Sequence, residues 1–483
     1  MTTLPRPMRL ALALATCVFA ASALSAPPDT RAAAGSLLKA VPGDVSDVPQ
    51  AAEAGVRRSR LVTVDLSLLR AEGARQMLRE PAVTLELFPD ITLFAEFLRY
   101  DPSPRGMTWV GGVEGVPRST VTLAYSGGLL TGTVSMPNGS YHIRPVAANA
   151  RTAAPQTAPL HLVTQVDQAA LPREAEPIEI RLSPAQLAAA ADTPMSDTGD
   201  EIDLLVLYTS NAANHAGGQA GITNLINVGV SETNTSYANS DVAQRIRLVH
   251  AEQVSYVESS NFSLNLFDLR SGVGALSGVA AMRDAYGADL VTMLVHPSAP
   301  SACGVAFLMT QISTAFATSA FSVTDTGCVS PNFTFAHELG HNMGARHDWY
   351  VDGGTTPFTY AHGYVNPAVG QRWRTVMAYP DMCSSLGFSC TRVLFWANPD
   401  QRYLPSCDAG RFNCGLLQYW YYPGAPMGVP GGTSTGCQPG NAGNAGCDAD
   451  DRRALNNTAL TIANLRQRVI TSQDRRALPR GGR

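Results

Sequence analysis

Hydrophobic and polar residues alternate in a series of short runs in the first third of the chain. The runs cover residues 60–66, 82–87, 107–112, 119–123, 129–134 and 140–144. Turn-forming residues separate them, as at Pro137, Asn138 and Gly139. Because the side chains of a strand point alternately to its two faces, this pattern predicts a small antiparallel β domain.

The segment from about residue 147 to 199 differs, because it is rich in alanine, proline and threonine. Such a composition is typical of a linker. We interpret much of this segment as linker and expect a short helix at 184–191.

Apolar runs and helical spacing alternate in the second half of the chain. Strands are predicted at 202–208, 246–250 and 290–295, with further strand material at 304–309 and 320–323. Helices are predicted at 222–237, where Gly229 weakens the pattern, and at 278–286, with Ser277 as candidate N-cap. Strands that alternate with helices indicate an α/β sandwich.

The last part of the chain differs in composition from the two parts before it. Residues 383–447 are rich in glycine, proline and cysteine and include an aromatic cluster at 419–422. We interpret them as a lobe that completes the α/β domain, and a separate substrate-binding module is the alternative. Helical spacing then predicts a closing helix over 450–470.

The first residues have the order of a secretory signal. Two arginines precede a short apolar run, residues 10–20, and small residues follow. This order predicts a signal peptide over 1–26, cut after Ala23 or Ala26. Acylation at Cys17, as in a lipoprotein, is an alternative that the short apolar run disfavours. No later run reaches about 20 apolar residues, so we expect a secreted protein without a membrane segment after signal removal.

Composition and charge narrow the class of protein. Of 483 residues, 45% are hydrophobic and 15% are charged, which excludes wholesale disorder. This length predicts roughly two to four domains. The net charge of −4 provides no overall basic field, so we expect no nucleic-acid partner.

Eight of the nine cysteines lie after the predicted signal. An even number in an exported chain predicts about four disulfides. Cys383–Cys390 and Cys437–Cys447 are the local loops that cost the least entropy to close. The remaining connectivity stays open.

The segment 335–348 carries the most specific chemistry. His337 and His341 are four residues apart, so a helix places both imidazoles on one face, within reach of one metal ion. Gly344 permits a turn that ends the helix, and the chain then brings His347 round as a third ligand. Three imidazoles leave the fourth position of a zinc ion open for water. Glu338 would take the water proton as general base and pass it to the leaving amine.

The motif His-Glu-x-x-His-x-x-Gly-x-x-His resembles that of the metzincin clan of zinc endopeptidases. Segment 374–379 looks like the clan's methionine-containing turn, with Met377 as its methionine. Asp348, directly after the third ligand, is similar to the reprolysin-like branch. The segment 395–399 narrows the resemblance to the bacterial peptidyl-Asp metalloendopeptidase family.

The resemblance implies the fold and the roles of individual residues. It implies an α/β (α+β) catalytic domain with a mixed sheet and an active-site helix, preceded by a small β-rich prodomain. His337, His341 and His347 are implied as ligands of one catalytic Zn²⁺, and Glu338 as the base. Tyr379 occupies the place where some metzincins hold a tyrosine that contacts the zinc or the oxyanion, and a plain core residue is the alternative. The other histidines lack ligand spacing and are interpreted as structural or surface residues; they are His142, His161, His215, His250, His296 and His362.

We therefore predict a secreted zinc endopeptidase made as a zymogen. The predicted parts are a signal peptide (1–26), a propeptide with a β-rich domain and linker (27–198) and a catalytic domain with a disulfide-rich C-terminal lobe (199–483). The propeptide is expected to inhibit the enzyme intramolecularly and to be cut between about 185 and 203. It contains no cysteine that could hold zinc, and Asp44 is a weak candidate for that role.

Two other functions fit the same motif. One is a zinc-dependent amide hydrolase that acts on a non-peptide substrate, since the motif does not define the acyl group. The other is a secreted adhesin with a structural metal site, which the intact Glu338 disfavours.

The family resemblance also implies cleavage of proteins or peptides on the N-terminal side of Asp, or of Glu. A carboxylate in the pocket just past the scissile bond needs a cation. The chain after the signal has one lysine, Lys39, which lies in the predicted propeptide, so the cation is expected to be an arginine. Arg372, Arg374 and Arg392 are the candidates, with Arg392 ranked first.

Overall fold

The computed structural model describes ten stretches of the chain. They are residues 35–69, 82–103, 106–137, 139–147, 158–191, 194–368, 372–403, 424–431, 436–441 and 446–469. The predicted signal peptide, Cys407, Cys414 and the aromatic cluster at 419–422 lie outside these residues. The described residues from 36 onward form one compact unit.

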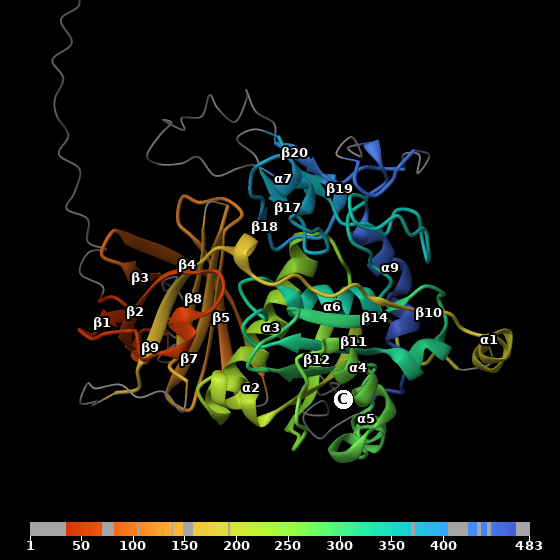
Figure 1. The fold of residues 1–483 in the computed structure, drawn as a ribbon, viewed down its shortest axis with the longest axis horizontal. Helices are drawn as coiled ribbons and strands as arrows, with labels where there is room; N and C mark the ends of the chain where they lie inside the picture. The colour runs from red at the N-terminus through yellow and green to blue at the C-terminus, as the bar shows by residue number, and fades with distance from the viewer. Residues whose placement is uncertain are drawn as a thin grey trace, which may run out of the picture. The chain divides into compact units, whose positions relative to one another are not determined.

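A nine-stranded sheet occupies the N-terminal part of this unit (Figure 1). Its strand order is β1-β2-β9-β8-β7-β6-β5-β4-β3, and all of its neighbouring strands pair antiparallel. The strands are β1 (Leu38–Ala40), β2 (Val56–Val64), β3 (Val83–Phe88), β4 (Ile91–Ser103), β5 (Gly106–Val113), β6 (Thr120–Ser126), β7 (Leu129–Met136), β8 (Gly139–Pro145) and β9 (His161–Val166). Two short 3-10 helices, η2 (Pro49–Ala52) and η3 (Leu66–Leu69), accompany them.

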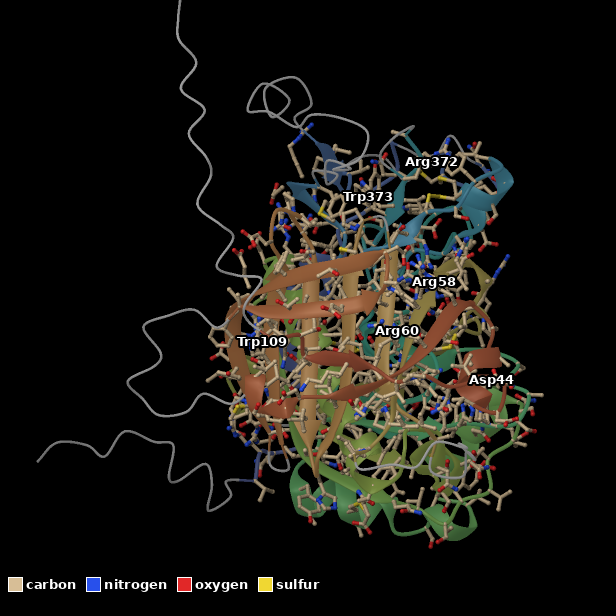
Figure 2. The ribbon with its side chains drawn as sticks, turned by 90° about the vertical axis from the view of Figure 1, so that its left-hand side faces the viewer. Asp44, Arg58, Arg60, Trp109, Arg372 and Trp373 are labelled. Carbon is tan, nitrogen blue, oxygen red and sulfur yellow. A yellow bond between two sulfur atoms is a disulfide. The ribbon has the colours of Figure 1, made fainter. Side chains whose placement is uncertain are left out.

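One face of this sheet builds an apolar core from the residues that alternate in sequence. Trp109, Val121, Leu123 and Leu130 are fully buried there, and Figure 2 shows Trp109 among the strands. Gly111 leaves room for the Trp109 ring, because a Cβ at residue 111 would lie 2.4 Å from it. The predicted antiparallel strands are thus present, and β4 is an additional strand.

The interpretation of residues 147–199 as mostly linker is wrong in part. The strand β9 lies inside the nine-stranded sheet between β2 and β8. Most of its side chains are buried, and residues 161–166 pair with both neighbouring strands. The 3-10 helix η4 (Gln168–Ala170) and the strand β10 (Ile178–Ile180) follow. The predicted short helix is α1 (Pro184–Ala191), and none of its residues is buried.

The second large sheet is mixed and has six strands, in the order β10-β14-β15-β13-β11-β12. Its strands are β10, β11 (Glu201–Tyr208), β12 (Arg245–Gln253), β13 (Leu290–Val295), β14 (Gly304–Met309) and β15 (Phe321–Asp325). β14 runs antiparallel to β15, and the other pairs are parallel. The predicted strands are therefore present, in the mixed α/β arrangement that was expected.

Helices pack on this sheet and on each other. They are α2 (Ser210–His215), α3 (Gln219–Asn239), α4 (Phe262–Ser271), η5 (Gly274–Leu276), α5 (Val279–Tyr286), η6 (Thr314–Ser319) and α6 (Thr334–Asn342). Gly229 does not interrupt α3, and it permits close packing, since a Cβ there would lie 3.1 Å from the Phe335 ring of α6. Ser277 is not the N-cap of α5: Gly278 holds that position, and Ser277 follows η5 instead.

The C-terminal part adds short elements and disulfides. The elements are β16 (Val365–Asn366), β17 (Trp373–Arg374), α7 (Asp381–Ser385), β18 (Thr391–Arg392), β19 (Asn398–Tyr403), β20 (Ala425–Met427) and α9 (Asp451–Ile462). The two predicted local disulfides are present, together with Cys303–Cys328. The closing helix is shorter than predicted and begins at an Asp450 side chain that accepts from the Arg453 amide. Within the described residues, no helix has the length and apolar character needed to cross a membrane.

Candidate active site

The helix α6 places two of the predicted ligands on one face. It is fully buried, and Gly340 lets it approach its neighbours, because a Cβ there would lie 2.7 Å from the Trp396 ring and 2.9 Å from the Met377 sulfur. The helix ends at Met343, and Gly344 then adopts a φ of +87°, which glycine tolerates without strain. This turn brings His347 back toward the helix, as the sequence predicts.

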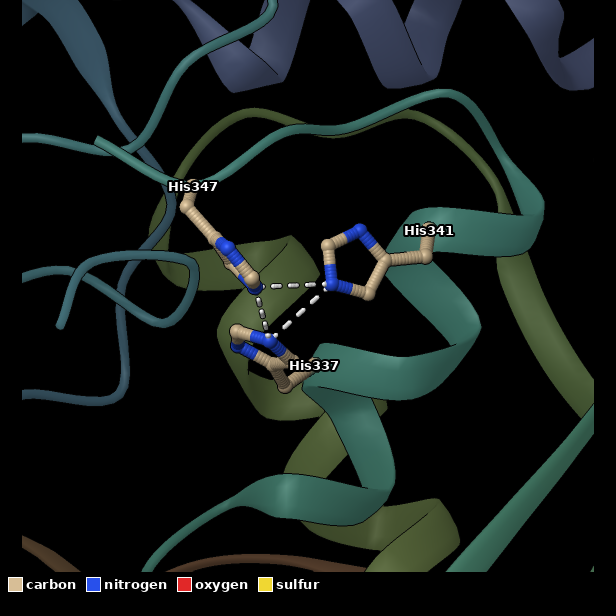
Figure 3. A group of neighbouring side chains, drawn as sticks. All are labelled: His337, His341 and His347. Atoms are coloured by element: carbon tan, nitrogen blue, oxygen red, sulfur yellow. Dashed lines mark hydrogen bonds between the residues drawn. The ribbon is translucent and has the colours of Figure 1, made fainter. Parts of the chain in front are cut away.

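The three histidines point their Nε2 atoms at one another (Figure 3). These nitrogens lie 3.0–3.1 Å apart, and all three side chains are fully buried. The Nδ1 of His337 donates to the Val376 carbonyl at 2.9 Å, and that of His341 donates to the Ala345 carbonyl at 2.8 Å. Burial lowers the pKa of His337 to about 3 and that of His341 well below its ordinary value, so both rings stay neutral.

This donor set fits a metal ion. Because the Nδ1 atoms of His337 and His341 carry the ring protons, their Nε2 atoms present lone pairs to each other and to His347. Converging lone pairs repel unless a cation lies between them. Three nitrogens that each lie about 2 Å from one zinc ion would be separated by about 3.3 Å, close to the observed spacing. The three side chains can therefore hold one metal ion.

Glu338 lies next to this group and is also fully buried. Neither of its carboxylate oxygens has a hydrogen-bond partner among the described residues. Gly304 of β14 makes room for it, since a Cβ there would lie 2.6 Å from Oε1. Burial raises the pKa of Glu338 well above its ordinary value, and the negative charge of Glu174 raises it further. An unpartnered buried carboxylate is costly, and it suits a group that handles a proton.

The predicted methionine turn lies beside the histidines. Met377 is fully buried, and Val376 supplies the carbonyl that orients His337. The carboxylate of Asp348 accepts from the Tyr379 amide at 2.8 Å and from the Tyr350 amide at 3.1 Å. Asp348 therefore ties the segment that follows the third histidine to the turn.

Tyr379 stands against the same histidines. Its ring centroid lies 4.0 Å from that of His347, and its hydroxyl donates to the Glu174 carbonyl oxygen at 2.8 Å. The hydroxyl thus reaches a peptide carbonyl next to the candidate metal site.

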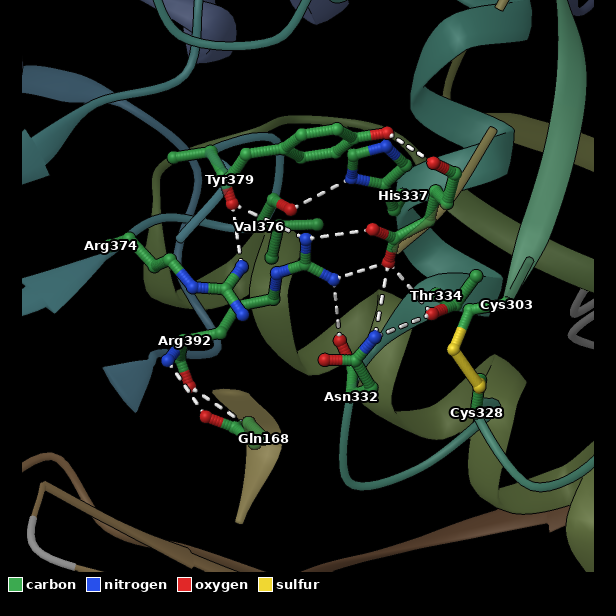
Figure 4. Close-up of polar contacts among 12 residues, drawn as sticks. Gln168, Cys303, Cys328, Asn332, Thr334, His337, Arg374, Val376, Tyr379 and Arg392 are labelled. Carbon is green, nitrogen blue, oxygen red and sulfur yellow. Dashed lines mark hydrogen bonds and ion pairs between the residues drawn. A yellow bond between two sulfur atoms is a disulfide. The ribbon is translucent and has the colours of Figure 1, made fainter. Parts of the chain in front are cut away.

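A polar pocket binds the Glu174 carboxylate. Figure 4 shows its donors, Arg392, Thr334 and Asn332, on the same side of the structure as His337. Arg392 donates from Nη1 to Oε1 at 2.5 Å and from Nη2 to Oε2 at 3.2 Å. Thr334 and Asn332 donate to Oε1 at 2.8 Å and 3.1 Å. The side chains of Arg392 and Glu174 are 1% and 2% exposed, so this pair is removed from water. Burial favours the neutral acid, but the Arg392 charge holds the pKa of Glu174 well below its ordinary value.

The three candidate arginines have different surroundings. Arg392 is the one that binds a carboxylate, and Gln168 accepts from its backbone amide at 2.8 Å. Arg374 is buried beside it and donates to the Ala378 carbonyl at 2.6 Å. Arg372 is exposed, and its guanidinium lies 3.8 Å from the centroid of the Phe388 ring (Figure 2).

Asp44 is not at the candidate metal site, so its suggested role in latency is wrong. It is exposed and accepts from the amide and hydroxyl of Ser46, and Figure 2 shows it beside the N-terminal sheet. Besides Glu338 and Asp348, two acidic residues lie near the site that sequence analysis missed, Glu174 and Glu176. The sequence feature that could have indicated them is an acidic stretch within the segment interpreted as linker.

Two of the histidines that lack ligand spacing, His215 and His296, belong to another polar cluster. Glu53, His215 and His296 lie close enough to share an ion. However, Glu53 also pairs with the guanidinium of Arg144 at 2.6 Å, and Arg144 lies 3.0 Å from His215 Nε2. The cluster already contains a cation, and it joins the N-terminal sheet to residues of the mixed-sheet part.

Comparisons with known proteins agree with the site. Residues 198–401 match the family described as metallo-peptidase family M12B, reprolysin-like. A peptidyl-Asp metalloendopeptidase of Stenotrophomonas maltophilia (strain R551-3) is 30% identical over 76% of this chain and 75% of its own length. One from Xanthomonas campestris is 33% identical over 62% of this chain and 67% of its own length.

Among solved structures, metalloproteinase-II from Bacteroides fragilis is 11% identical, with a TM-score of 0.35 over 56% of this chain and 82% of that one. The sequence matches above confirm the resemblance seen in the motif. The chain therefore belongs to the reprolysin-like M12B metallopeptidases, in the family of the bacterial peptidyl-Asp metalloendopeptidases, and it is a metalloendopeptidase.

Proposed function

We propose that the protein is a secreted, zinc-dependent endopeptidase that cleaves on the N-terminal side of Asp, or of Glu, and is made as a zymogen. The observation that carries the proposal is the convergence of three histidine nitrogens beside a fully buried, unpartnered Glu338. Membership of a metallopeptidase family argues for peptides as substrates, rather than for a non-peptide amide or for an adhesin.

Five side chains have defined roles in the proposed reaction. His337, His341 and His347 hold one Zn²⁺, which when bound supplies Lewis-acid activation of water and of the scissile carbonyl. Glu338 takes the proton of the attacking water and delivers it to the leaving amine. Tyr379 donates a hydrogen bond to the carbonyl oxygen as negative charge develops on it, which its contact with the Glu174 carbonyl supports.

The proposed specificity rests on the Arg392 pocket. A buried guanidinium without a counter-charge is costly, so a pocket of this kind favours a substrate side chain that brings a carboxylate. Thr334 and Asn332 add two neutral donors that fit the same group. The names of the relatives refer to Asp, which agrees with this chemistry.

Export and processing complete the proposal. The N-terminal pattern predicts a signal peptide, and disulfides such as Cys303–Cys328 are typical of exported proteins. We place removal of the propeptide between about 185 and 203, where the unburied helix α1 is open to nicking.

The test combines metal content with turnover. The wild-type protein is expected to bind one zinc per chain and to hydrolyse casein, and a chelator is expected to abolish hydrolysis. Glu338→Gln should keep the zinc and lower kcat by about 10²–10⁴-fold, because only the proton transfer is removed.

His341→Ala should lose the zinc, whereas the control His250→Ala should keep both zinc and activity, since His250 stacks on Tyr286 away from the site. Stoichiometric zinc in His341→Ala, or full activity in Glu338→Gln, would overturn the proposed site.

A further inference from the structure

The pocket that is proposed to receive an acidic substrate side chain is filled by the chain itself. Its occupant, Glu174, lies in the segment predicted to be removed on maturation. Four hydrogen bonds from Arg392, Thr334 and Asn332 hold its carboxylate, and both members of the ion pair are almost fully buried. A linker that merely crosses the surface has no need of such a contact.

The backbone around Glu174 is bound as well. The Cys303 amide donates to the Arg173 carbonyl at 2.8 Å, and the Ala175 amide donates to the Gly304 carbonyl at 2.8 Å. The strand β10 then pairs with β14, with Ile178 opposite Phe307. β14 would be the edge of the mixed sheet without β10, so this segment occupies the edge on which an extended peptide can be added as a strand.

The segment that contains Glu174 runs in the opposite direction to a substrate. Along the chain, Glu174 fills the pocket first, and Glu176 then lies next to the histidines, with Oε2 3.6 Å from His347 Nδ1. The segment thus runs from the pocket to the candidate metal site. A substrate cut on the N-terminal side of its acidic residue must run the opposite way, because its scissile carbonyl belongs to the residue before the one in the pocket.

The peptide bond that lies at the candidate site is therefore not the bond that would be cleaved in a substrate. Tyr379 contacts the carbonyl of Glu174 itself, which belongs to the bond on the C-terminal side of the acidic residue. The amide nitrogen of Glu174, which in a substrate would be the leaving group, belongs to the preceding peptide bond, whose Arg173 carbonyl accepts from the Cys303 amide instead.

We infer that residues 173–180 are a substrate-mimicking inhibitor strand, in which Glu174 fills the acidic-residue pocket while the chain runs in the reverse direction. The inference rests on the proposed preference for an acidic residue after the scissile bond. It assigns latency to a carboxylate in the specificity pocket rather than to a group on the metal. Cleavage between about 185 and 203 separates this strand from the catalytic part, so the strand can leave together with the N-terminal sheet.

Glu174→Gln in the full-length chain tests the inference, with Glu176→Gln as the matched control from the same strand. Both are made in a Glu338→Gln background, so that the chain stays uncut and the readout is independent of activity. Hydrogen exchange of the zinc-loaded protein is measured over residues 171–182. Loss of one partner of a buried ion pair should speed exchange in Glu174→Gln by about tenfold or more. The exposed Glu176 should change it by less than about threefold.

A second readout uses the unprocessed chain with Glu338 intact. Glu174→Gln should raise its initial rate on a short Asp-containing peptide by about tenfold or more before any processing, and Glu176→Gln should not. Unchanged exchange and latency in Glu174→Gln, or a larger release by Glu176→Gln, would overturn the inference and leave the proposed function standing. A processed enzyme that shows no preference for acidic residues would overturn that preference, and the mimicry with it.

Discussion

The N-terminal sheet and the mixed sheet are each held together by an apolar core, but the zone where they meet is polar. Trp109 and Leu123 belong to one core and Val206 and Leu294 to another, and these two clusters are separate. The helix α3 contacts strands of both sheets. Toward the N-terminal sheet it uses hydrogen bonds: Ser126 to Asn224 at 2.7 Å, Ser231 to Asp101 at 2.6 Å and Arg99 to Thr235 at 2.7 Å.

The polar character of this boundary affects the free energy needed to separate the two parts. A shared apolar core would be exposed to water on separation, at about 25 cal/mol for each Å² of apolar surface. Polar contacts instead exchange their partners for water at little net cost. Buried contacts such as Glu53–His215 hold the two parts together without merging their cores. The arrangement suits a proposed propeptide that folds with the enzyme and is later discarded.

The largest effect is expected from a change inside the N-terminal core. Trp109→Ala removes a fully buried ring and should destabilise the N-terminal sheet by about 3–5 kcal/mol. Because the mixed sheet has its own core, its urea unfolding transition should stay within about 0.5 kcal/mol of wild type. Unfolding is followed by separate probes for the two parts, such as hydrogen exchange of β7 and of β13. Equal destabilisation of both parts would show that the cores are coupled.

The acidic pocket should give the next largest effect. In the processed enzyme, Arg392→Met should lower kcat/KM for a peptide with Asp after the scissile bond by roughly 30- to 1,000-fold, because the substrate carboxylate loses its buried partner. A matched peptide with Asn in that position should be affected far less. Arg372→Met is the control, since Arg372 is exposed over Phe388. Equal losses for both peptides would indicate general damage rather than a specificity pocket.

Sequence and structure agree where the local pattern is strong. β13 and β14 were predicted to the residue, because each is a short, predominantly apolar run that is buried along its whole length. The histidine group followed from spacing alone, since His337 and His341 lie one helical turn apart and Gly344 marks the turn that brings back His347. These features depend on residues close in sequence.

The missed features depend on residues far apart in sequence. β4 was not predicted because most of its side chains are half-buried or exposed, which blurs the alternation. β9 was missed because its flanks have the composition of a linker. The pocket is formed by Glu174 and Arg392, which are 218 positions apart, and no local pattern shows that a carboxylate from one segment meets a guanidinium from another.

A pH-dependent contact lies where the two parts meet. Glu232 of α3 accepts from the Ser330 hydroxyl at 2.9 Å, which also contacts Thr133 of β7. Burial raises the pKa of Glu232 from 4.5 to about 8. Between these values the unfolded chain has released a proton that the folded chain keeps, so this group lowers stability as pH rises from about 4.5 to 8.

Glu232→Gln should remove that contribution, which amounts to roughly 2–4 kcal/mol over the window. The measurement is urea unfolding of the uncut Glu338→Gln chain at pH 5 and pH 8, with and without the second substitution. The difference between the two pH values should be smaller in the double variant by that amount. An identical pH dependence in both chains would show that Glu232 is ionised in the folded protein at both pH values.

Tyr379 should give the smallest effect. Tyr379→Phe removes one hydrogen bond to the carbonyl oxygen and should lower kcat of the processed enzyme by about tenfold, with KM nearly unchanged. The ring stays in place against His347, so zinc content should not change. A kcat equal to that of wild type would show that Tyr379 is a plain core residue.

Cleavage-site mapping of a mixed peptide library is the most direct test of the proposed enzyme and its specificity. The processed, zinc-loaded protein is incubated with the library, and the new N-termini are identified by mass spectrometry beside a Glu338→Gln digest. Most new N-termini are expected to be Asp or Glu, and they should be absent from the Glu338→Gln digest. Cleavage mainly before bulky apolar residues, or the same cleavages in both digests, would contradict the assignment of Arg392 and Glu338 to specificity and catalysis.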